Sequence, residues 1–350
     1  MKIRKLFSIF FFTFIVFSCS SGGGGSPTDP SDPGDGNGEG NEVTFSNATN
    51  FDAPNQLEII SWNIQTFPQS SKTNDYLEVL LTKWNADVYF FQEIQNKNQL
   101  IALANELSEY SLVLSSTTQN MHFGLLYKST NSDCATCGII TFNGKNELWS
   151  NTPNSNDGDM DFANNANYQF ASRPPMENFL TRSNGSKTFD FYLIGTHYKC
   201  CGNDQYENEK DNPGAEIFRR YAASSLLKDY YANNRQQANV FIVGDFNNVG
   251  NQSITNPAIA PLSDPSINDG YFKLIDEPVF QQHPTKYAWQ GWRNRYDPAH
   301  LDHIFISESM FSYENAVGGV VDMLTETGLT GNEIDDVLSD HQPIFIRLIP

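Results

Sequence analysis

The sequence predicts an α/β fold in which two β-sheets pack against each other and helices cover their outer faces. A series of short apolar segments typical of strands, and a few longer segments with helical spacing, carry this prediction. The aromatic content of 13% favours sheets over helical bundles. With 350 residues and 39% hydrophobic side chains, the chain is long enough to bury a sizeable core.

Apolar, β-branched and aromatic runs mark the expected strands. These strands span residues 57–63, 87–93, 122–128, 138–142, 176–180, 188–196, 239–245, 272–276, 302–306, 316–322 and 343–348. Helices are expected over residues 73–84, 97–108 and 213–232, and the third follows Asn212, a good helix cap, with Pro213 in its first turn. Residues 146–171 and 249–270 are polar, so we expect long surface loops there.

The first 18 residues have the pattern of a signal peptide. Three basic residues precede an apolar run from Leu6 to Phe17, which is too short to span a bilayer comfortably. Cys19 then lies in a sequence similar to a bacterial lipobox. We therefore expect an exported protein that is lipidated at Cys19 and anchored to a bacterial membrane, at the outer membrane or cell surface. An ordinary cleaved signal with an incidental cysteine is the alternative.

A low-complexity segment separates this start from the folded part of the chain. Residues 19–50 contain Gly, Ser, Pro, Asp and Asn with hardly an apolar side chain, so they are expected to form a disordered linker. One folded domain should then occupy residues 55–350. The net charge of −19 argues against tight, sequence-independent binding of nucleic acid. It does not exclude turnover of nucleic acid, because a divalent cation inverts the field of an acidic cleft.

Four cysteines follow the linker, at Cys134, Cys137, Cys200 and Cys201. In an exported protein these favour disulfides that hold two loops. Zinc is the alternative, but the adjacent Cys200 and Cys201 suit a tetrahedral site poorly. Four cysteines allow three pairings, and the sequence does not choose among them.

Several expected strands end in a residue that binds metals or carries protons. Asn63, Glu93, His197 and Asp245 each close an apolar run, and the pair Asp340-His341 precedes another. Each residue taken alone has an ordinary structural explanation, such as a turn, a helix cap or a buried hydrogen bond. Together they predict that strand ends converge on one carboxylate-rich cleft, which is how a hard cation is held for hydrolysis.

The chemistry of single residues supports this interpretation. At the period of two residues in a strand, Asp245 and Asn247 face the same side, where a carboxylate binds a cation or orients water and an amide holds a phosphoryl oxygen. His341 is suited to take a proton from water, or to face charge on phosphate when protonated. Asp302, at the start of a strand, would orient His341 as the second member of a dyad.

The order of these residues resembles the endonuclease/exonuclease/phosphatase superfamily. The resemblance extends over residues 57–348, and its motifs are SWN at 61–63, QE at 92–93, TH at 196–197, GDFN at 244–247, LDHI at 301–304 and SDH at 339–341. It implies a four-layer α/β sandwich of two packed, mostly antiparallel sheets with helices on the outside. It also implies a bound divalent cation, Mg²⁺ or Mn²⁺, with Ca²⁺ as an alternative.

The resemblance further implies how the metal would be held. Glu93 would be the principal metal ligand, with Asn63 and Asp340 nearby. Asp245 would bind the metal or position the attacking water.

The resemblance assigns the remaining residues to the substrate. Asn247 would hold the phosphate, and His341, paired with Asp302, would be the general base or the charge partner of the phosphoryl group. His197 would be a second phosphate-facing histidine, and Arg173 would support the phosphate from a loop before a strand.

These residues predict metal-dependent hydrolysis of a phosphodiester, by a cell-surface or secreted nuclease acting on nucleic acid as a monomer. A sphingomyelinase-like enzyme or an inositol-phosphate phosphatase is the alternative. Basic loops of the kind that grip duplex DNA are not evident, and Arg293 with Arg295 is the main local concentration of positive charge in the later part of the chain. A non-catalytic surface-binding lipoprotein is disfavoured, because no expected catalytic position has been replaced.

Overall fold

The computed structural model describes residues 43–350, with gaps at residues 117–120, 132–137, 156–161, 186, 201–211, 213–214, 251–252, 281–286, 294–296 and 314. The described residues belong to one compact unit, Glu42–Pro350. The predicted signal peptide, Cys19, most of the predicted linker, and Cys134, Cys137 and Cys201 lie outside the described residues.

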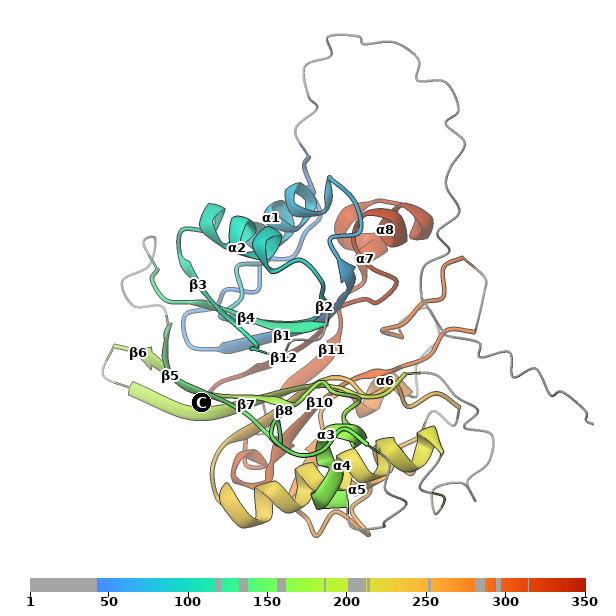
Figure 1. The fold of residues 1–350 in the computed structure, drawn as a ribbon. Helices are drawn as coiled ribbons and strands as arrows, with labels where there is room; N and C mark the ends of the chain where they lie inside the picture. Colours follow the sequence, from blue (N-terminus) through green and yellow to red (C-terminus); the bar gives the residue numbers. More distant parts are fainter. Residues whose placement is uncertain are drawn as a thin grey trace, which may run out of the picture. The chain divides into compact units, whose positions relative to one another are not determined.

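Two six-stranded sheets form the centre of this unit (Figure 1). The first has the order β11-β12-β1-β2-β4-β3, with β1 at Leu57–Phe67, β2 at Val88–Ile94, β3 at Tyr110–Leu114, β4 at His122–Lys128, β11 at Val317–Val320 and β12 at Ile344–Leu348. The second has the order β5-β6-β7-β8-β10-β9, with β5 at Ile139–Glu147, β6 at Met176–Asn184, β7 at Lys187–His197, β8 at Val240–Asp245, β9 at Phe272–Leu274 and β10 at Asp302–Ser307. The pairs β1–β2 and β7–β8 are parallel, and the other neighbours are antiparallel.

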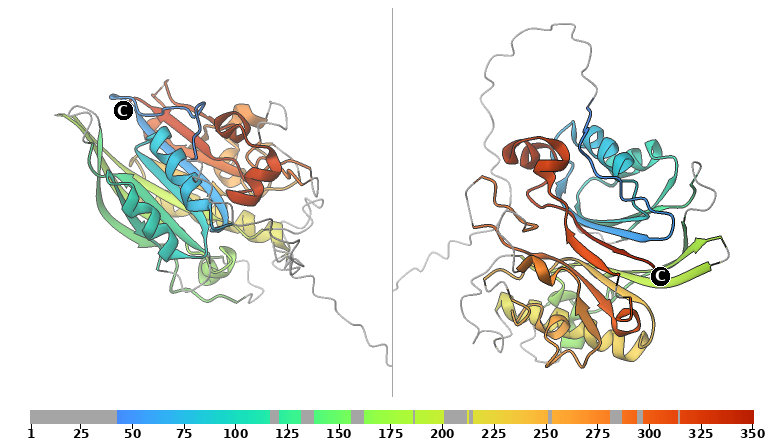
Figure 2. Two further views of the ribbon diagram at one scale, coloured as in Figure 1. Left: turned by 90° about the horizontal axis from the view of Figure 1, so that it is seen from above. Right: turned by 180° about the vertical axis from the view of Figure 1, so that it is seen from behind.

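Helices cover the outer face of each sheet, which makes the four layers that the sequence predicted (Figures 1 and 2). The first sheet is covered by α1 at Thr73–Trp84, α2 at Lys97–Glu106, α7 at Met323–Thr327 and α8 at Gly331–Val337. The second is covered by α3 at Ala166–Gln169, α4 at Glu216–Asn234 and α5 at Ala260–Ser263. The short helix α6 spans Glu277–Phe280. Two 3₁₀ turns, η1 and η4, span Phe162–Asn165 and Glu308–Met310. No helix among the described residues is both long and apolar enough to cross a membrane.

The strands alternate between two apolar cores, and this alternation decides where their last residues point. In β8, Phe241 and Val243 pack between the sheets, whereas Val240 and Ile242 pack under the outer helices. The same alternation holds in β1, β7 and β10. A polar residue at the end of such a strand therefore faces either the space between the sheets or the helix layer, according to its place in the alternation.

The predicted strands and long helices are confirmed, with shifted ends, but several short elements were missed. The half-buried edge strand β3 was not predicted, nor were α7 and α8, although Thr330 and Glu333 form a capping box at the start of α8. The predicted loops at 146–171 and 249–270 are wrong in part, because η1, α3 and α5 lie within them. Phe170 and Leu262 are fully buried there, so tertiary packing stabilises turns too short to show a helical period.

Candidate functional site

Polar strand ends from both sheets meet at one end of the space between them. Extending the alternation of β1, β7, β8 and β10 places Asn63, His197, Asp245 and Asp302 on the faces that the two sheets turn toward each other. Within the second sheet, Asp245 pairs in register with His197 on one side and with Asp302 on the other. Three neighbouring strands thus deliver two carboxylates and an imidazole to one edge.

Glu93 reaches this place through a backbone irregularity. By simple alternation after Val88 and Phe90, Glu93 would point toward the outer helices. The pairing of β2 with β4 shifts register between Phe91 and Ile94, and Glu93 has a left-handed φ of 61°. Irregularities of this kind re-aim a side chain, and here the carboxylate of Glu93 turns toward the cleft.

Asn63 bridges the two sheets through its side-chain amide. Its Nδ2 donates to Glu93 Oε1 at 3.1 Å and to Asp245 Oδ2 at 3.0 Å. His197 Nε2 lies 3.8 Å from the same Glu93 oxygen and 3.6 Å from the same Asp245 oxygen. The structure therefore brings together side chains that are up to 182 positions apart in the chain.

His341 and Asp302 form a hydrogen-bonded pair beside this cluster. His341 Nδ1 lies 2.7 Å from Asp302 Oδ2, and both side chains are buried. His341 Nε2 lies 3.9 Å from Asp245 Oδ2 and 3.9 Å from Asp340 Oδ1. One ring nitrogen is thus held by Asp302, and the other faces the carboxylates of the cleft.

Contacts with β1 hold the Ser339–His341 segment in place. Ser339 Oγ donates to the carbonyl of Asn63 at 2.6 Å, and Trp62 Nε1 donates to the carbonyl of His341 at 2.9 Å. These bonds tie the C-terminal part of the chain to the strand that carries Asn63.

Two residues that the sequence did not assign to the site hold Asp340. Trp289 Nε1 donates to Asp340 Oδ2 at 3.0 Å, and the backbone N–H of Asp340 donates to Gln65 Oε1 at 3.3 Å. No local pattern marks Gln65 for this role, because its partner lies 275 positions away. Nearby, Arg293 pairs with Asp335 and Asp336, and Arg295 lies outside the described residues.

On the other side of the cluster, Arg173 contacts His197. Arg173 Nη1 lies 3.3 Å from Nδ1 and 3.2 Å from Nε2 of the imidazole. Arg173 Nη2 and Asn247 Nδ2 both donate to the carbonyl of Tyr198, the second at 3.2 Å. The backbone N–H of Asn247 donates to Asp245 Oδ1 at 2.8 Å. The site residues predicted from the sequence therefore form one connected group.

Left-handed backbone conformations concentrate around this group. Six non-glycine residues here have positive φ, namely Gln65, Thr66, Glu93, Ala171, Ser172 and Asn247. Each such conformation costs about 1–3 kcal/mol and persists only where the surroundings enforce it. The N–H of Thr66, for example, donates to Glu93 Oε2 at 3.0 Å. This part of the chain holds its side chains in place at a cost in backbone energy.

The electrostatics of the site show crowded negative charge. Burial, followed by the charge of Asp302, raises the pKa of Asp245 to about 8. Burial also raises the pKa of Asp340. Burial lowers the pKa of His341, but Asp302 outweighs it, so that this pKa lies well above its ordinary value. Burial and then Arg173 hold the pKa of His197 well below its ordinary value.

A divalent cation fits this set of donors. Glu93, His197 and Asp245 each offer one ligand atom, and these atoms lie within 4.8 Å of one another. The two carboxylates match the oxygen ligands that Mg²⁺ and Mn²⁺ prefer, and the imidazole of His197 borders the same position. Positive charge at this position also relieves the repulsion that raises the pKa of Asp245.

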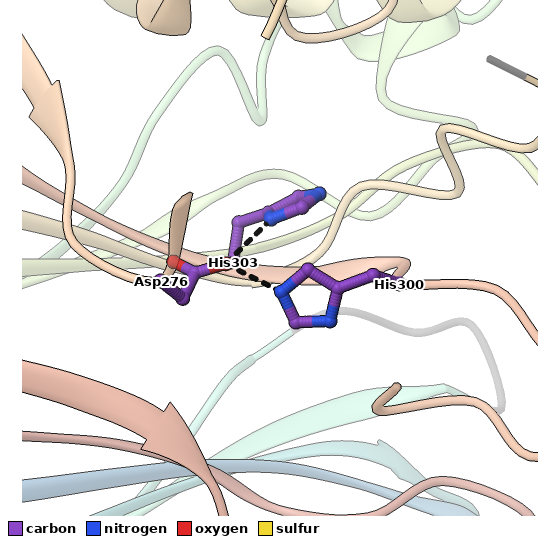
Figure 3. Close-up of side chains that lie close together, drawn as sticks. All are labelled: Asp276, His300 and His303. Atoms are coloured by element: carbon purple, nitrogen blue, oxygen red, sulfur yellow. Dashed lines mark hydrogen bonds and ion pairs between the residues drawn. The ribbon is translucent and has the colours of Figure 1, made fainter. Parts of the chain in front are cut away.

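A second Asp–His cluster lies in the helix-side layer and is closed by hydrogen bonds (Figure 3). Asp276 Oδ2 lies 2.6 Å from His300 Nε2 and 2.8 Å from His303 Nδ1, and all three residues are fully buried. The backbone N–H of Ile304 donates to Asp276 Oδ1 at 2.7 Å, and His303 Nε2 lies 2.9 Å from Asn248 Oδ1. These are hydrogen-bond lengths, and the carboxylate has its partners within the protein.

Comparison with known proteins places this arrangement in context. Residues 60–341 match the sequence profile described as the Endonuclease/Exonuclease/phosphatase family. No curated protein matched the chain.

Among solved structures, D. rerio TDP2 complexed with single-strand DNA product has a TM-score of 0.54 and 15% identity, covering 84% of this chain and 98% of its own. An endonuclease/exonuclease/phosphatase family protein from Bacteroides thetaiotaomicron has a TM-score of 0.53 and 15% identity, covering 84% and 97%. The catalytic domain of human Nocturnin has a TM-score of 0.51 and 13% identity, covering 85% and 95%.

Proposed function

Because the chain belongs to the Endonuclease/Exonuclease/phosphatase family, whose members are phosphoesterases, we propose that it is a metal-dependent phosphodiesterase and, more narrowly, a nuclease. One observation carries the proposal. The donor cluster of Glu93, His197 and Asp245 lies beside the hydrogen-bonded pair of Asp302 and His341. A cation site next to a held imidazole is suited to metal-assisted hydrolysis of a phosphodiester.

In this proposal Glu93 and Asp245 hold Mg²⁺ or Mn²⁺, with Asp340 at the border of the site. Asn63 donates its amide hydrogens to both carboxylates and thereby sets their separation. When bound, the cation would neutralise negative charge at the phosphate and polarise its oxygens.

The protein's own residues would divide the remaining work. Asp302 accepts the Nδ1 hydrogen of His341 and directs Nε2 toward the cleft, where it takes a proton from water or faces the charge of the phosphoryl group. Asn247 and the pair of His197 and Arg173 would contact phosphate oxygens from the opposite side. Burial of all five side chains keeps these donors oriented before the substrate arrives.

The substrate that we favour is a nucleic-acid strand. The observation that supports it is the similarity of fold to TDP2, which has been seen with single-stranded DNA product. Most hydrogen bonds between proteins and DNA go to phosphate and sugar rather than to base edges. Since phosphate groups dominate such binding, the proposal does not distinguish DNA from RNA.

A substrate panel tests the proposal. The fragment 45–350 would be assayed with Mg²⁺, Mn²⁺ and Ca²⁺ on plasmid DNA, single-stranded RNA, sphingomyelin and bis(p-nitrophenyl) phosphate. We expect hydrolysis of at least one phosphodiester that EDTA abolishes, with nucleic acid preferred. Activity on sphingomyelin alone would replace the nuclease by a sphingomyelinase-like enzyme. Activity that survives EDTA would reject metal dependence.

We also propose that the protein is exported and lipid-anchored, on the support of the sequence pattern around Cys19. In the bacterium that produces it, Cys19→Ala should move the protein from the membrane fraction to the soluble fraction. Continued membrane association of this variant would reject lipidation at Cys19.

A further inference from the structure

A pocket of about 580 Å³ adjoins the proposed metal site on the side of Arg173. Its lining includes Gln95, which lies two residues after Glu93, and Arg173, which contacts His197. The pocket is therefore adjacent to the proposed catalytic residues. Its volume lies within the range of about 300–1,000 Å³ that is typical of sites for ligands of nucleotide size and larger.

Among the described residues, the charged side chains that line this pocket are all basic. They are Arg173 after the loop that follows α3, Lys199 after β7, and Arg219 in the first turn of α4. Glu216 is an acidic neighbour, and it lies 3.7 Å from both Lys199 Nζ and Arg219 Nη1. A surplus of positive charge here contrasts with the net charge of −19 for the whole chain. Such a contrast is expected where an acidic protein receives an anion.

Two of these cations are held rigidly and are only partly satisfied by the protein. Arg173 and Arg219 are each 7% exposed. The guanidinium of Arg219 lies 3.9 Å from the centre of the Tyr168 ring, and it also donates to the Tyr168 carbonyl. Within the described part of the chain, the Nε–H of each arginine has no hydrogen-bond partner. Burying a guanidinium with incomplete pairing is unfavourable unless a ligand supplies negative charge.

We propose that this pocket, the cationic subsite, uses Lys199 and Arg219 to bind a phosphate of the substrate other than the cleaved one, which Arg173 would contact at the border of the pocket. The proposal rests on the proposed function and narrows its substrate class to molecules with at least two phosphate groups, of which a nucleic-acid strand is the case that we favour. Planar guanidinium groups suit the oxygens of phosphate. A choline headgroup carries a positive charge, which the cationic subsite would repel.

The proposal predicts a preference that binding measures directly. The full-length protein would be titrated, with Mg²⁺ present, with thymidine monophosphate and with thymidine 3′,5′-bisphosphate. We expect the bisphosphate to bind at least about 10-fold more tightly, because one charge-assisted hydrogen-bonded contact contributes about that factor. Equal affinities in the wild-type protein would overturn the proposal, whether or not the protein turns over a substrate.

Charge-removing variants locate the effect. Arg219→Gln and Lys199→Gln should each reduce the preference for the bisphosphate several-fold. Lys228→Gln, on the same helix but paired with the exposed Asp269 at 2.8 Å, removes the same charge outside the pocket and should leave the preference as it is. If Arg219→Gln lowers the thermal midpoint through lost packing on Tyr168, the half-exposed Lys199 provides the second test. An unchanged preference in both pocket variants would contradict the cationic subsite.

Kinetics then separate this inference from the proposed function. In the pocket variants, KM for a short oligonucleotide should rise more than KM for bis(p-nitrophenyl) phosphate, which has one phosphate. A parallel rise for both would mean that Arg219 and Lys199 serve the cleaved phosphate, against the proposal. The same kinetics with an inositol polyphosphate as substrate show whether the second phosphate belongs to a nucleic-acid strand or to an inositol ring. If nothing is hydrolysed but the bisphosphate preference holds, the proposed function fails and the subsite remains.

Discussion

Two consecutive residues of β10, Asp302 and His303, each take part in an Asp–His contact on opposite faces of the same sheet. Asp302 shares its face with Ile304 between the sheets and lies 2.7 Å from His341. His303 shares its face with Phe305 under the helices and lies 2.8 Å from Asp276 (Figure 3). Residue type, burial and contact length are thus nearly the same, and the two pairs still differ in their remaining contacts.

The difference lies in what completes each pair. Both oxygens of Asp276 accept hydrogen bonds, and the far nitrogen of His303 lies 2.9 Å from Asn248 Oδ1. In the other pair, Asp302 Oδ1 has no partner among the described residues, and the far nitrogen of His341 faces two carboxylates at 3.9 Å. A closed network stabilises the fold, whereas an open one leaves donors and acceptors for a cation, water or substrate.

The largest effect should follow from opening the closed cluster. Asp276→Ala should lower the free energy of unfolding by roughly 3–5 kcal/mol, because it leaves buried donors without a partner. Urea denaturation measures the change. As a control, Asp269→Asn removes an exposed charge and keeps a residue type that tolerates the left-handed φ of 58°, so it should change the free energy of unfolding by less than about 0.5 kcal/mol. A small loss in Asp276→Ala would show that the two Asp–His pairs do not differ as described.

The next effect concerns activity and the open pair. His341→Ala should reduce kcat/KM for a phosphodiester by more than ~100-fold. Initial rates at saturating metal measure it, alongside a thermal melt of the same preparation. Wild-type turnover in His341→Ala, or in Glu93→Ala, would remove the proposed mechanism.

Metal addition should distinguish the two clusters more finely. Mg²⁺ or Mn²⁺ should raise the thermal midpoint of the EDTA-treated protein by a few degrees, since binding at 100 times Kd stabilises by about 2.7 kcal/mol. The shift should vanish in Glu93→Gln and persist in Asp276→Asn, because the closed cluster does not require the ion. If the shift were lost in Asp276→Asn but kept in Glu93→Gln, the ion would bind at the cluster of Asp276, His300 and His303, which would contradict the proposal.

A third buried carboxylate extends the comparison to pH. Glu58 has no hydrogen-bond partner for either oxygen among the described residues, and burial followed by Asp87 raises its pKa to about 10. His303 and His300 hold the pKa of Asp276 below its ordinary value, against the effect of burial. In the folded state, the hydrogen-bonded carboxylate of Asp276 is therefore stabilised in its charged form, and the carboxyl group of Glu58 is stabilised in its protonated form.

The smallest expected effect follows from this difference. A folded-state pKa above the unfolded value means that wild-type stability falls as pH rises from about 4.5 toward 10. Relative to wild type, Glu58→Gln should therefore gain at least about 1 kcal/mol between pH 5 and pH 8. Equal pH trends for Glu58→Gln and wild type would contradict the assignment.

Much of the fold and part of the site were predictable from local patterns. The apolar runs located most of the strands and the polar residues that stand at their ends. Edge strand β3 and the short helices were not predicted, because the hydrophobic periodicity of half-buried strands and single helical turns is weak. The capping box formed by Thr330 and Glu333 is a local signal that marks the start of α8.

The sequence alone thus determined which side chains stand at strand ends, and the order of those residues implied the family to which the chain belongs. Tertiary structure decided which of these side chains contact the same carboxylate oxygens, and it turns Glu93 inward at an irregularity of β2. It also decided that both oxygens of Asp276 accept hydrogen bonds, whereas one oxygen of Asp302 has no partner among the described residues. It also decided that Lys199 and Arg219 meet Arg173 in one pocket. The reason is physical: strand alternation is a local property of the backbone, whereas hydrogen bonding and burial depend on partners hundreds of positions away.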